Sequence, residues 1–398
     1  MEKNVFRLGT VCSKIGSGAT PTGGKEAYQG GGYKLIRSQN VVDLRFAYDG
    51  LAEINEKQAA KLNNVKVEEK DVLLNITGDS VARCCLAPID ILPARVNQHV
   101  AIIRPKAEIL NPYYLLFWLI VNKQYLLALA AAGATRNGLT KAMISGLVLE
   151  CPSLEKQNRI ASILSTYDTL IENNTKRIRL LEKMAENLYK EWFVRFRFPG
   201  HENVEMEKGL PKGWKYCRLS KVSEYSNSKI PSEQVTFYVS TENMMKDFGG
   251  IDQNVLSRPS EGSATKVETG NILISNIRPY FKKIWFADKE AACSNDVLNI
   301  KAKDGIPPMF LYHSLKQDSF FRYMTIGSNG TKMPRGNKNF TMKYPIIIPT
   351  GNIMVVFSDI AIKLNKWGSI LRQQNSLLAR QRDLLLPRLM SGKLEVKM

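Results

Sequence analysis

The sequence is poor in the residues that build metal centres and disulfide frameworks. Its six cysteines form no Cys-x-x-Cys pair, and its three histidines, His99, His201 and His313, lie far apart along the chain. This spacing excludes the common zinc-ligand patterns. Six scattered thiols in a chain of 398 residues also argue against a disulfide-stabilised domain and favour a reducing, cytoplasmic setting.

Long hydrophobic runs are equally scarce. The most apolar stretch, residues 113–121, is followed by Asn122, Lys123 and Gln124 and is too short to cross a bilayer. The first five residues contain no apolar signal core. We therefore expect this run to form a buried helix, and we expect no membrane association.

Acidic residues are outnumbered by basic ones. The 56 lysines and arginines stand against 37 aspartates and glutamates, which gives a net charge of +19. Cutting the chain at residues 150, 198 and 350 leaves four segments that are all basic. Basic charge spread along a folded chain favours nucleic acid as the partner, because it can follow a track of phosphates. A basic protein with no such partner is the alternative.

The chain also repeats itself, which is the most informative feature of the sequence. Five short segments of the first half recur in the same order in the second half, and this order indicates a duplicated domain. The paired segments are residues 7–11 and 218–222, 67–74 and 267–274, 98–104 and 295–301, 111–115 and 307–311, and 135–136 and 331–332.

The pattern shared by the two halves is that of an α+β domain. The β-branched runs at residues 72–76 and 100–103 predict strands. Pro112 and Pro308 each precede a mostly apolar segment, as is typical of the first turn of a helix. Residues 198–214 are polar and rich in Pro and Gly, which predicts a linker or a surface loop.

A long helix is predicted after each half. Residues 155–193 contain neither Pro nor Gly, and at 1.5 Å per residue such a helix would be roughly 58 Å long. Its apolar residues follow a heptad in which Asn174 is the one clearly polar seam position. The seam residues are Leu164, Ile171, Ile178, Ala185 and Trp192 with Ile160, Tyr167, Asn174, Leu181 and Leu188.

The second long helix is predicted over residues 355–386, with Pro387 ending or kinking it. It carries one strong apolar stripe, which suits packing against a single partner, and the first helix is the natural one. Two independent surface helices are the alternative. The stripe consists of Phe357, Leu364, Leu371, Leu378 and Leu385, with Ile360 and Trp367 beside it.

These observations predict an α+β protein with two tandem, similar α/β domains, separated by two long helices that pack as an antiparallel coiled coil. The domains are residues 1–152 and 199–350, and the helical spacers are residues 153–198 and 351–398. A covalent pair of related domains can bind two half-sites on one DNA duplex, as a symmetric dimer does. Because the two halves differ between their shared segments, we expect the half-sites to differ.

Several short motifs add a family resemblance to this architecture. They are Leu210-Pro211-Lys212-Gly213-Trp214 followed by Arg218-Leu219, Gly133-x-Thr135 and Gly330-Thr331 before the helices, Pro152-x-x-Glu155-x-Gln157-x-x-Ile160, and Leu384-Leu385-x-x-x-Leu389-Met390-Ser391-Gly392-Lys393-Leu394. Over its whole length the chain resembles the specificity subunits of Type I restriction–modification systems. One departure is that residues 349–352 lack the Glu-x-Gln seen after Pro152, which leaves the start of the second helix open.

The resemblance implies a function and partners. Each domain would be a target-recognition domain for one part of a bipartite, asymmetric site. The helices would act as a ruler and as the docking surface for two modification subunits, which methylate adenine with S-adenosylmethionine. Restriction subunits, which are ATP-driven helicase–nucleases that use Mg, would complete the enzyme, and this chain would bind none of these cofactors.

Base reading requires planar or bidentate donors on loops, such as Arg for guanine and Asn or Gln for adenine. The alternative for each candidate is a solvated surface group. In the first half the candidates are Arg37, Ser38, Gln39, Asn40, Thr77, Arg83 and Arg136. In the second half they are Asn276, Arg278, Tyr280, Lys282, Lys283, Lys332 and Arg335.

Catalytic motifs are weak by comparison. The segment Asn111-Pro112-Tyr113-Tyr114 is similar to the Asn-Pro-Pro-Tyr loop of adenine methyltransferases. However, its third residue is Tyr and no glycine-rich loop for a methyl donor precedes it, so a helix start is favoured. Residues 19–26 lack the first Gly and the final Ser or Thr of a phosphate-binding loop. A solitary DNA methyltransferase and a coiled-coil adaptor remain the rival functions.

Overall fold

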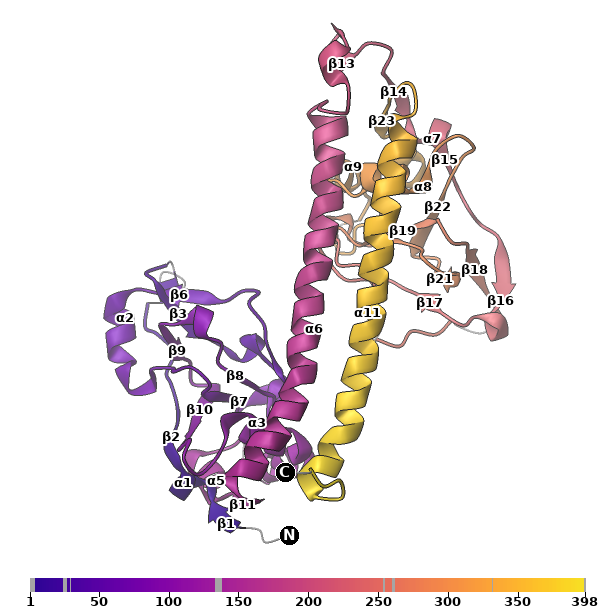
Figure 1. The fold of residues 1–398 in the computed structure, drawn as a ribbon. Coiled ribbons are helices and arrows are strands. Elements are labelled where there is room, and N and C mark those ends of the chain that lie inside the picture. The colour runs from indigo at the N-terminus through magenta and orange to yellow at the C-terminus, as the bar shows by residue number, and fades with distance from the viewer. Residues whose placement is uncertain are drawn as a thin grey trace. The chain divides into compact units, whose positions relative to one another are not determined.

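Each of the two long helices contributes to both of the units into which the chain divides. The computed structural model describes residues 4–23, 27–28, 30–132, 138–252, 255–259, 262–330 and 332–396. Unit 1 consists of residues 1–173 and 374–398, and unit 2 of residues 174–373. Figure 1 shows the elements of both units.

Unit 1 is built on a four-stranded antiparallel sheet in the order β2-β10-β7-β8. A second sheet, β6-β3-β9, contains a parallel pair, and β1 pairs with β11. The strands are β1 (Asn4–Arg7), β2 (Cys12–Ser17), β3 (Tyr33–Ile36), β4 (Val41–Val42), β5 (Arg45–Phe46), β6 (Ala52–Ile54), β7 (Val72–Asn75), β8 (Cys84–Leu86), β9 (Ala94–Val96), β10 (Val100–Pro105) and β11 (Val148–Cys151). We call the part of each unit outside the long helices its lobe. The helices of the unit 1 lobe are α1 (Leu8–Val11), α2 (Glu56–Lys61), α3 (Pro112–Val121), α4 (Lys123–Ala131) and α5 (Lys141–Gly146).

The central sheet of unit 1 is buried on both faces, which explains its continuous apolar strands. Val72 and Leu74 pack in one hydrophobic cluster with α3, whereas Leu73 packs in the other with the second sheet. Successive strand residues point to opposite faces, so both faces require apolar side chains. The strand predicted over residues 72–76 is therefore confirmed, as is the one over residues 100–103.

Unit 2 repeats this plan. Its central antiparallel sheet has the order β15-β22-β19-β20, β14 pairs with β23, and the sheet β16-β18-β21-β17 again contains one parallel pair. The strands are β12 (Met206–Glu207), β13 (Leu210–Pro211), β14 (Lys215–Arg218), β15 (Ser223–Tyr225), β16 (Lys229–Pro231), β17 (Tyr238–Val239), β18 (Ser263–Val267), β19 (Ile272–Ser275), β20 (Ile284–Phe286), β21 (Ala291–Cys293), β22 (Val297–Ala302) and β23 (Pro345–Ile348). The helices are α7 (Leu219–Val222), α8 (Pro308–Leu315), α9 (Asp318–Ile326) and α10 (Lys338–Thr341).

The duplication predicted from the sequence is confirmed at the level of strand register. Ile102 pairs with Leu73 in unit 1, and Asn299 pairs with Leu273 in unit 2. Pro112 and Pro308 each occupy the first turn of a helix, as expected. The two lobes are therefore copies of one fold with different side chains between the shared elements.

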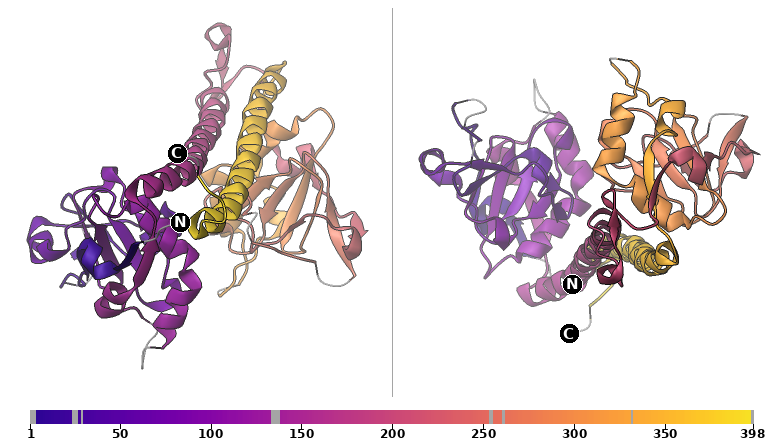
Figure 2. Two further views of the ribbon diagram at one scale, coloured as in Figure 1. Left: turned by 60° about the horizontal axis from the view of Figure 1, so that its bottom comes forward. Right: turned by 90° about the horizontal axis from the view of Figure 1, so that it is seen from above.

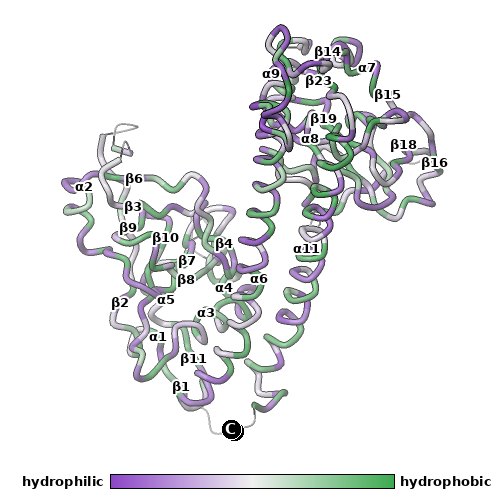
Figure 3. Tube along the Cα trace, turned by 45° about the horizontal axis from the view of Figure 1, so that its top comes forward, coloured by the Kyte–Doolittle hydropathy of each residue, from purple (hydrophilic) through white to green (hydrophobic). Residues whose placement is uncertain are grey.

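Both long helices are present, and they extend slightly beyond the predicted ends. Helix α6 (Leu154–Tyr189) continues into a single π-helical turn, Lys190–Val194, and helix α11 spans Ile353–Ser391. Figure 3 shows hydrophobic and hydrophilic residues alternating along both. Asn174, the predicted polar seam residue, is 8% exposed.

The two helices run antiparallel, and each unit contains part of the pair. In unit 1, Arg382 pairs with Asp168, and the Asn375 amide donates to the Ile171 carbonyl at 3.3 Å. In unit 2, Arg372 Nη1 donates to Glu182 Oε1 at 3.0 Å. As the residue number along α6 increases, the number of the contacting residue in α11 decreases. The pair can be followed in Figure 2. Antiparallel pairing is thus confirmed, and independent surface helices are excluded.

Two predictions near the helix ends need correction. Of the two predicted effects of Pro387, an end of the helix is wrong, because α11 continues to Ser391, and a kink stays a prediction. Leu386 and Leu389 on either side are buried in the unit 1 core, and their burial offsets the lost backbone hydrogen bond. Residues 198–214 are not simply a linker or surface loop. Phe198 and Trp214, at the two ends of the segment, are buried in the hydrophobic core of unit 2 and stack with ring centroids 4.9 Å apart. Their packing holds both ends of the segment against unit 2.

No single helix in the described part of the chain is long and apolar enough to cross a membrane. Only α3 and α4, which meet at 66°, satisfy the length and composition criterion as a bent pair. The expected burial of the run at residues 113–121 is confirmed, since Tyr114, Leu115 and Phe117 are each at most 1% exposed.

Candidate nucleic-acid interface

Three segments of unit 1 meet where strand β7 ends. The backbone N–H of Ile76 donates to the His99 carbonyl at 3.0 Å, and the N–H of Leu139 donates to the Ile76 carbonyl at 2.8 Å. The next residue, Thr77, is linked through its hydroxyl to His99 Nδ1 at 2.6 Å. The strand end, the turn before β10 and the segment before α5 therefore form one connected surface.

The three equivalent segments meet in unit 2, at the end of β19, and we call each of these two meeting points a junction. The N–H of Asn276 donates to the Asp296 carbonyl at 2.8 Å, and the N–H of Gly336 donates to the Asn276 carbonyl at 2.9 Å. Arg278 joins the junction through its N–H, which donates to the Pro334 carbonyl at 2.8 Å. Arg335 reaches across it, with Nη2 at 3.2 Å from Asp296 Oδ1. Three candidates from two distant parts of the sequence, Asn276 and Arg278 on one side and Arg335 on the other, thus come together.

The turn at residues 37–40 lies beside this junction in unit 1. The amide of Asn75 at the end of β7 donates to the Ser38 carbonyl at 2.9 Å and to the Val41 carbonyl at 3.2 Å. Arg37 and Gln39 both donate to the Gly50 carbonyl, at 2.6 and 3.1 Å. Arg37 is half-buried, whereas Gln39 is exposed and can rotate toward a ligand.

Asn40 differs from its neighbours because its side chain is fully buried. Its amide donates to the Ala47 carbonyl at 2.9 Å, and its side-chain oxygen accepts from the Arg37 N–H at 3.0 Å. An enclosed, bonded amide shapes a turn and is not free to contact a base. The geometry gives Asn40 a structural part in holding Arg37 in place.

The remaining candidates of unit 1 can be placed with one exception. Thr77 is half-buried and Arg83 is exposed, and the Arg83 carbonyl accepts from the Asn75 N–H at 2.8 Å. Arg136 lies outside the described residues, as do Thr135 and Thr331 of the matching motifs.

Several cations of unit 2 already have partners. Lys282 pairs with Asp318 at 2.6 Å, and this bond lowers the pKa of Asp318. Lys283 donates to the Thr241 carbonyl, and burial, with repulsion from Lys246, lowers its pKa. By contrast, Lys332 is exposed. Lys282 and Lys283 are thus less free than the sequence indicates.

Arg278 adopts an unusual backbone conformation. Its φ is +50°, in the left-handed region, which costs a non-glycine residue on the order of 1–2 kcal/mol. Its guanidinium lies 5.9 Å from the centre of the Phe281 ring, and its Nε is buried without a hydrogen-bond partner among the described residues. Tyr280, two residues on, is 47% exposed. Strain of this kind persists where the surrounding structure holds a residue in place for function.

Sequence reasoning missed two residues of the unit 1 junction. The Gln98 side-chain amide lies 3.0 Å from His99 Nε2, and Gln98 also bonds the Thr20 hydroxyl. The available signal was that residues 98–104 and 295–301 are matched segments of the repeat. That match was used only as evidence of duplication.

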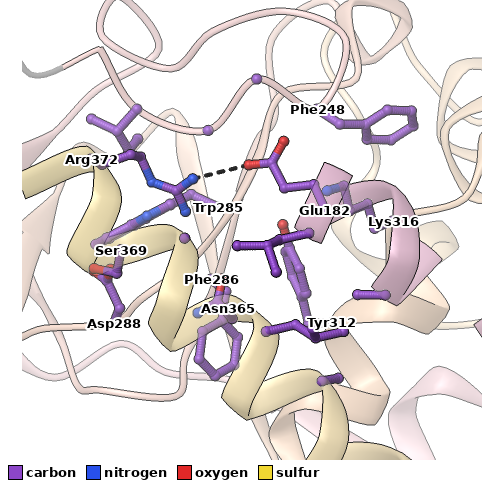
Figure 4. A pocket seen from close by; sticks show the side chains of 18 of the residues that line it. Glu182, Phe248, Trp285, Phe286, Asp288, Tyr312, Lys316, Asn365, Ser369 and Arg372 are labelled. Carbon is purple, nitrogen blue, oxygen red and sulfur yellow. Dashed lines mark hydrogen bonds and ion pairs between the residues drawn. The ribbon is translucent and has the colours of Figure 1, made fainter. Parts of the chain in front are cut away.

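A crevice in unit 2 lies elsewhere, between its sheets and its segments of the long helices (Figure 4). Its walls are tied by the Arg372–Glu182 ion pair and by a 2.7 Å hydrogen bond from Ser369 to Asp288. Among the lining residues is His313, and burial and the nearby charge of Lys316 lower the pKa of His313 to about 3. None of the DNA-binding candidates that the structure describes lines this crevice, so it belongs to the packing of the helices on the rest of unit 2.

No cluster of three or more His, Cys, Asp or Glu side chains suited to a metal ion occurs among the described residues. The segment similar to a methyltransferase loop forms the start of α3. There, the Asn111 side chain accepts from the N–H groups of Tyr113 and Tyr114, at 2.8 and 3.1 Å. Asn111 is therefore the N-cap of a buried helix.

Comparison with known proteins gives consistent results. Residues 1–183 match the family model of the Type I restriction modification DNA specificity domain. The chain is 26% identical to the MjaIX specificity subunit of Methanocaldococcus jannaschii, over 96% of this chain and 92% of that protein. It is 22% identical to the HindI specificity subunit of Haemophilus influenzae, over 90% and 94% of the two chains.

The fold is likewise similar to a solved structure. The crystal structure of the S subunit of a Type I restriction–modification system from M. genitalium superposes with a TM-score of 0.61 at 14% identity. The match covers 98% of this chain and 96% of that one. This likeness concerns the fold, including the two lobes and the long helices.

Proposed function

We propose, from the premise that this chain belongs to the family of Type I restriction–modification specificity subunits, that it reads two separate stretches of one DNA duplex. Each unit would read one part of a bipartite, asymmetric site. The net charge of +19 supports contact with a long track of phosphates.

The observation that carries this proposal is the duplicated junction at the ends of β7 and β19. The backbone hydrogen bonds are equivalent, from Ile76 to His99 and from Asn276 to Asp296, yet the side chains differ. A surface with a retained backbone and changed side chains can present different hydrogen-bonding groups from one scaffold. Two such surfaces suit two half-sites of unlike sequence.

The partners follow from the family. We propose that the long helices dock two modification subunits and that restriction subunits join that assembly. The long helices expose several large apolar side chains, which supports a protein-binding role because exposed apolar patches mark interaction surfaces. These side chains are Leu180, Met184, Trp367, Leu377 and Leu384.

We further propose that this chain has no catalytic activity of its own. S-adenosylmethionine, ATP and Mg would then be bound by the partner subunits, and the assembly would act on chromosomal DNA in the cytoplasm. The cap geometry of Asn111 favours this assignment over a solitary methyltransferase, because the segment similar to a catalytic loop is packed as a helix start.

Two measurements on the purified full chain test this function. Fluorescence anisotropy with random-sequence duplex should give an affinity that falls steeply with salt, because bound phosphates release counterions. Incubation with labelled methyl donor and duplex should transfer no label until modification subunits are added. Binding that is absent at low salt would favour the adaptor function, and transfer by the chain alone would favour the methyltransferase.

A further inference from the structure

One turn has the same backbone geometry in both units. In unit 1 it follows Thr77 and comprises residues 78–82, with φ of +72° at Gly78 and +65° at Ala82. In unit 2 it comprises residues 278–282, with φ of +50° at Arg278 and +52° at Lys282. A short 3₁₀ turn lies within each, Gly78–Ser80 and Pro279–Phe281. Left-handed residues therefore stand at equivalent places in the two lobes.

Equivalent hydrogen bonds hold both turns against the central sheet. The N–H of Asn75 donates to the Arg83 carbonyl at 2.8 Å, and the N–H of Ser275 donates to the Lys283 carbonyl at 3.1 Å. Three of the four left-handed residues are not glycine, so the backbone keeps a strained conformation although the sequence has changed. What the two lobes preserve here is the backbone, not the side chains.

The side chains that the turns present are chemically unlike. Unit 2 exposes Tyr280, whereas unit 1 exposes Asp79 at the neighbouring position of its turn. Asp79 forms no ion pair with any described residue. An unpaired carboxylate beside a surface for phosphates weakens general attraction to DNA. Its chemistry suits a different contact, because aspartate accepts hydrogen bonds from the N4 amino group of cytosine in the major groove.

We propose that residues 78–82 and 278–282 are equivalent base-reading turns, and that Asp79 is a specificity-determining residue that accepts a hydrogen bond from a cytosine in the half-site of unit 1. This inference rests on the proposed function and adds a residue that sequence reasoning did not select. Tyr280 contacts the other half-site through its ring and hydroxyl.

The test is selection from a random duplex library by the full chain, followed by sequencing. The variants are Asp79→Ala, Tyr280→Ala and the control Glu108→Ala, an exposed carboxylate beyond the opposite end of β10. We expect Asp79→Ala to lose about tenfold or more of the preference for cytosine at one position, the ordinary value of one base contact. Affinity for random duplex should stay equal or rise, since a negative charge has been removed. Tyr280→Ala should change only the other half-site, and Glu108→Ala neither.

The outcomes separate this inference from the function on which it rests. If the wild-type chain selects a two-part motif and Asp79→Ala selects the same motif with the same preference, the turn assignment is wrong and the proposed function stands. A variant that weakens both half-sites equally would also overturn it, because that result indicates a general rather than a base contact. If the wild-type chain selects no motif, the function and the turn assignment fail together.

Discussion

Replacing Phe357 with alanine is expected to destabilise unit 2 by about 3–5 kcal/mol. The ring is fully buried where α11 packs on the end of α6. Its centroid lies 5.2 Å from that of Phe193, 5.8 Å from Tyr189 and 5.5 Å from His313. The burial of such a side chain contributes about 1.5–3 kcal/mol, and the cavity adds more because rigid rings close it poorly.

Trp367 on the same helix provides the matched control. The heptad analysis places it beside the stripe that contains Phe357, but its side chain is 62% exposed. Trp367→Ala removes a larger side chain and should still cost less than about 1 kcal/mol, because most of its surface is already in water.

The assay is urea denaturation combined with native-state hydrogen exchange. Denaturation gives the change in the free energy of unfolding, and exchange locates it. Protection should fall in β19 and β22 of unit 2 for Phe357→Ala, and it should be nearly unchanged for Trp367→Ala. Equal losses for the two variants, or a loss below about 1 kcal/mol for Phe357→Ala, would refute the packing argument.

Three further predictions concern single side chains. Because burial lowers the pKa of His313 to about 3, the unfolded state takes up a proton that the folded state does not. The contribution of neutral His313 to the free energy of unfolding is therefore fully present above a pH of about 6.5 and should fall by about 1.4 kcal/mol per pH unit below it. His313→Gln should abolish that slope in urea titrations at pH 7, 6 and 5. Arg104→Met should destabilise unit 1 by about 3–5 kcal/mol, because it strands the buried carboxylate of Asp71, which Arg104 Nε contacts at 2.7 Å. The equivalent Lys301→Met breaks only an exposed pair and should cost less than about 1 kcal/mol; thermal unfolding that shows equal losses would contradict this reasoning. Arg278→Ala should weaken binding at one half-site only, by about 1–3 kcal/mol at moderate salt, and unchanged affinity for the selected duplex would remove Arg278 from the interface.

Much of the fold could be predicted because its signals are periodic. The first long helix follows from a heptad pattern without Pro or Gly, and the second from an apolar residue at every seventh position. The burial of Leu164 and Phe357 agrees with the predicted seams. The duplication follows from matched segments in one order, and the equivalent strand registers bear it out. The pairing of the two helices follows from one apolar stripe that needs a single partner, whereas their antiparallel direction is shown by the contacts of α11 with α6.

What could not be predicted depends on contacts between distant residues. Nothing in the local sequence says that Asn40 is enclosed by the turn it supports, or that Lys282 is paired with Asp318. Positive φ at Arg278 and Lys282 is equally hidden, because neither residue favours it and tertiary hydrogen bonds impose it. Which of the candidates contact bases stays a prediction that the selection experiment addresses.

The discontinuity of unit 1 has a consequence for the order of events during translation. Its core contains Leu386 and Leu389, which leave the ribosome only after the whole of unit 2 has been made. Until then, the first 173 residues expose the apolar surface that Leu386 and Leu389 cover in the folded unit 1. Unit 2 is continuous in sequence and can fold as soon as it leaves the ribosome. A chain cut short before Leu386 should therefore be a substrate for chaperones and proteases, so only finished copies would present two folded units to a DNA duplex.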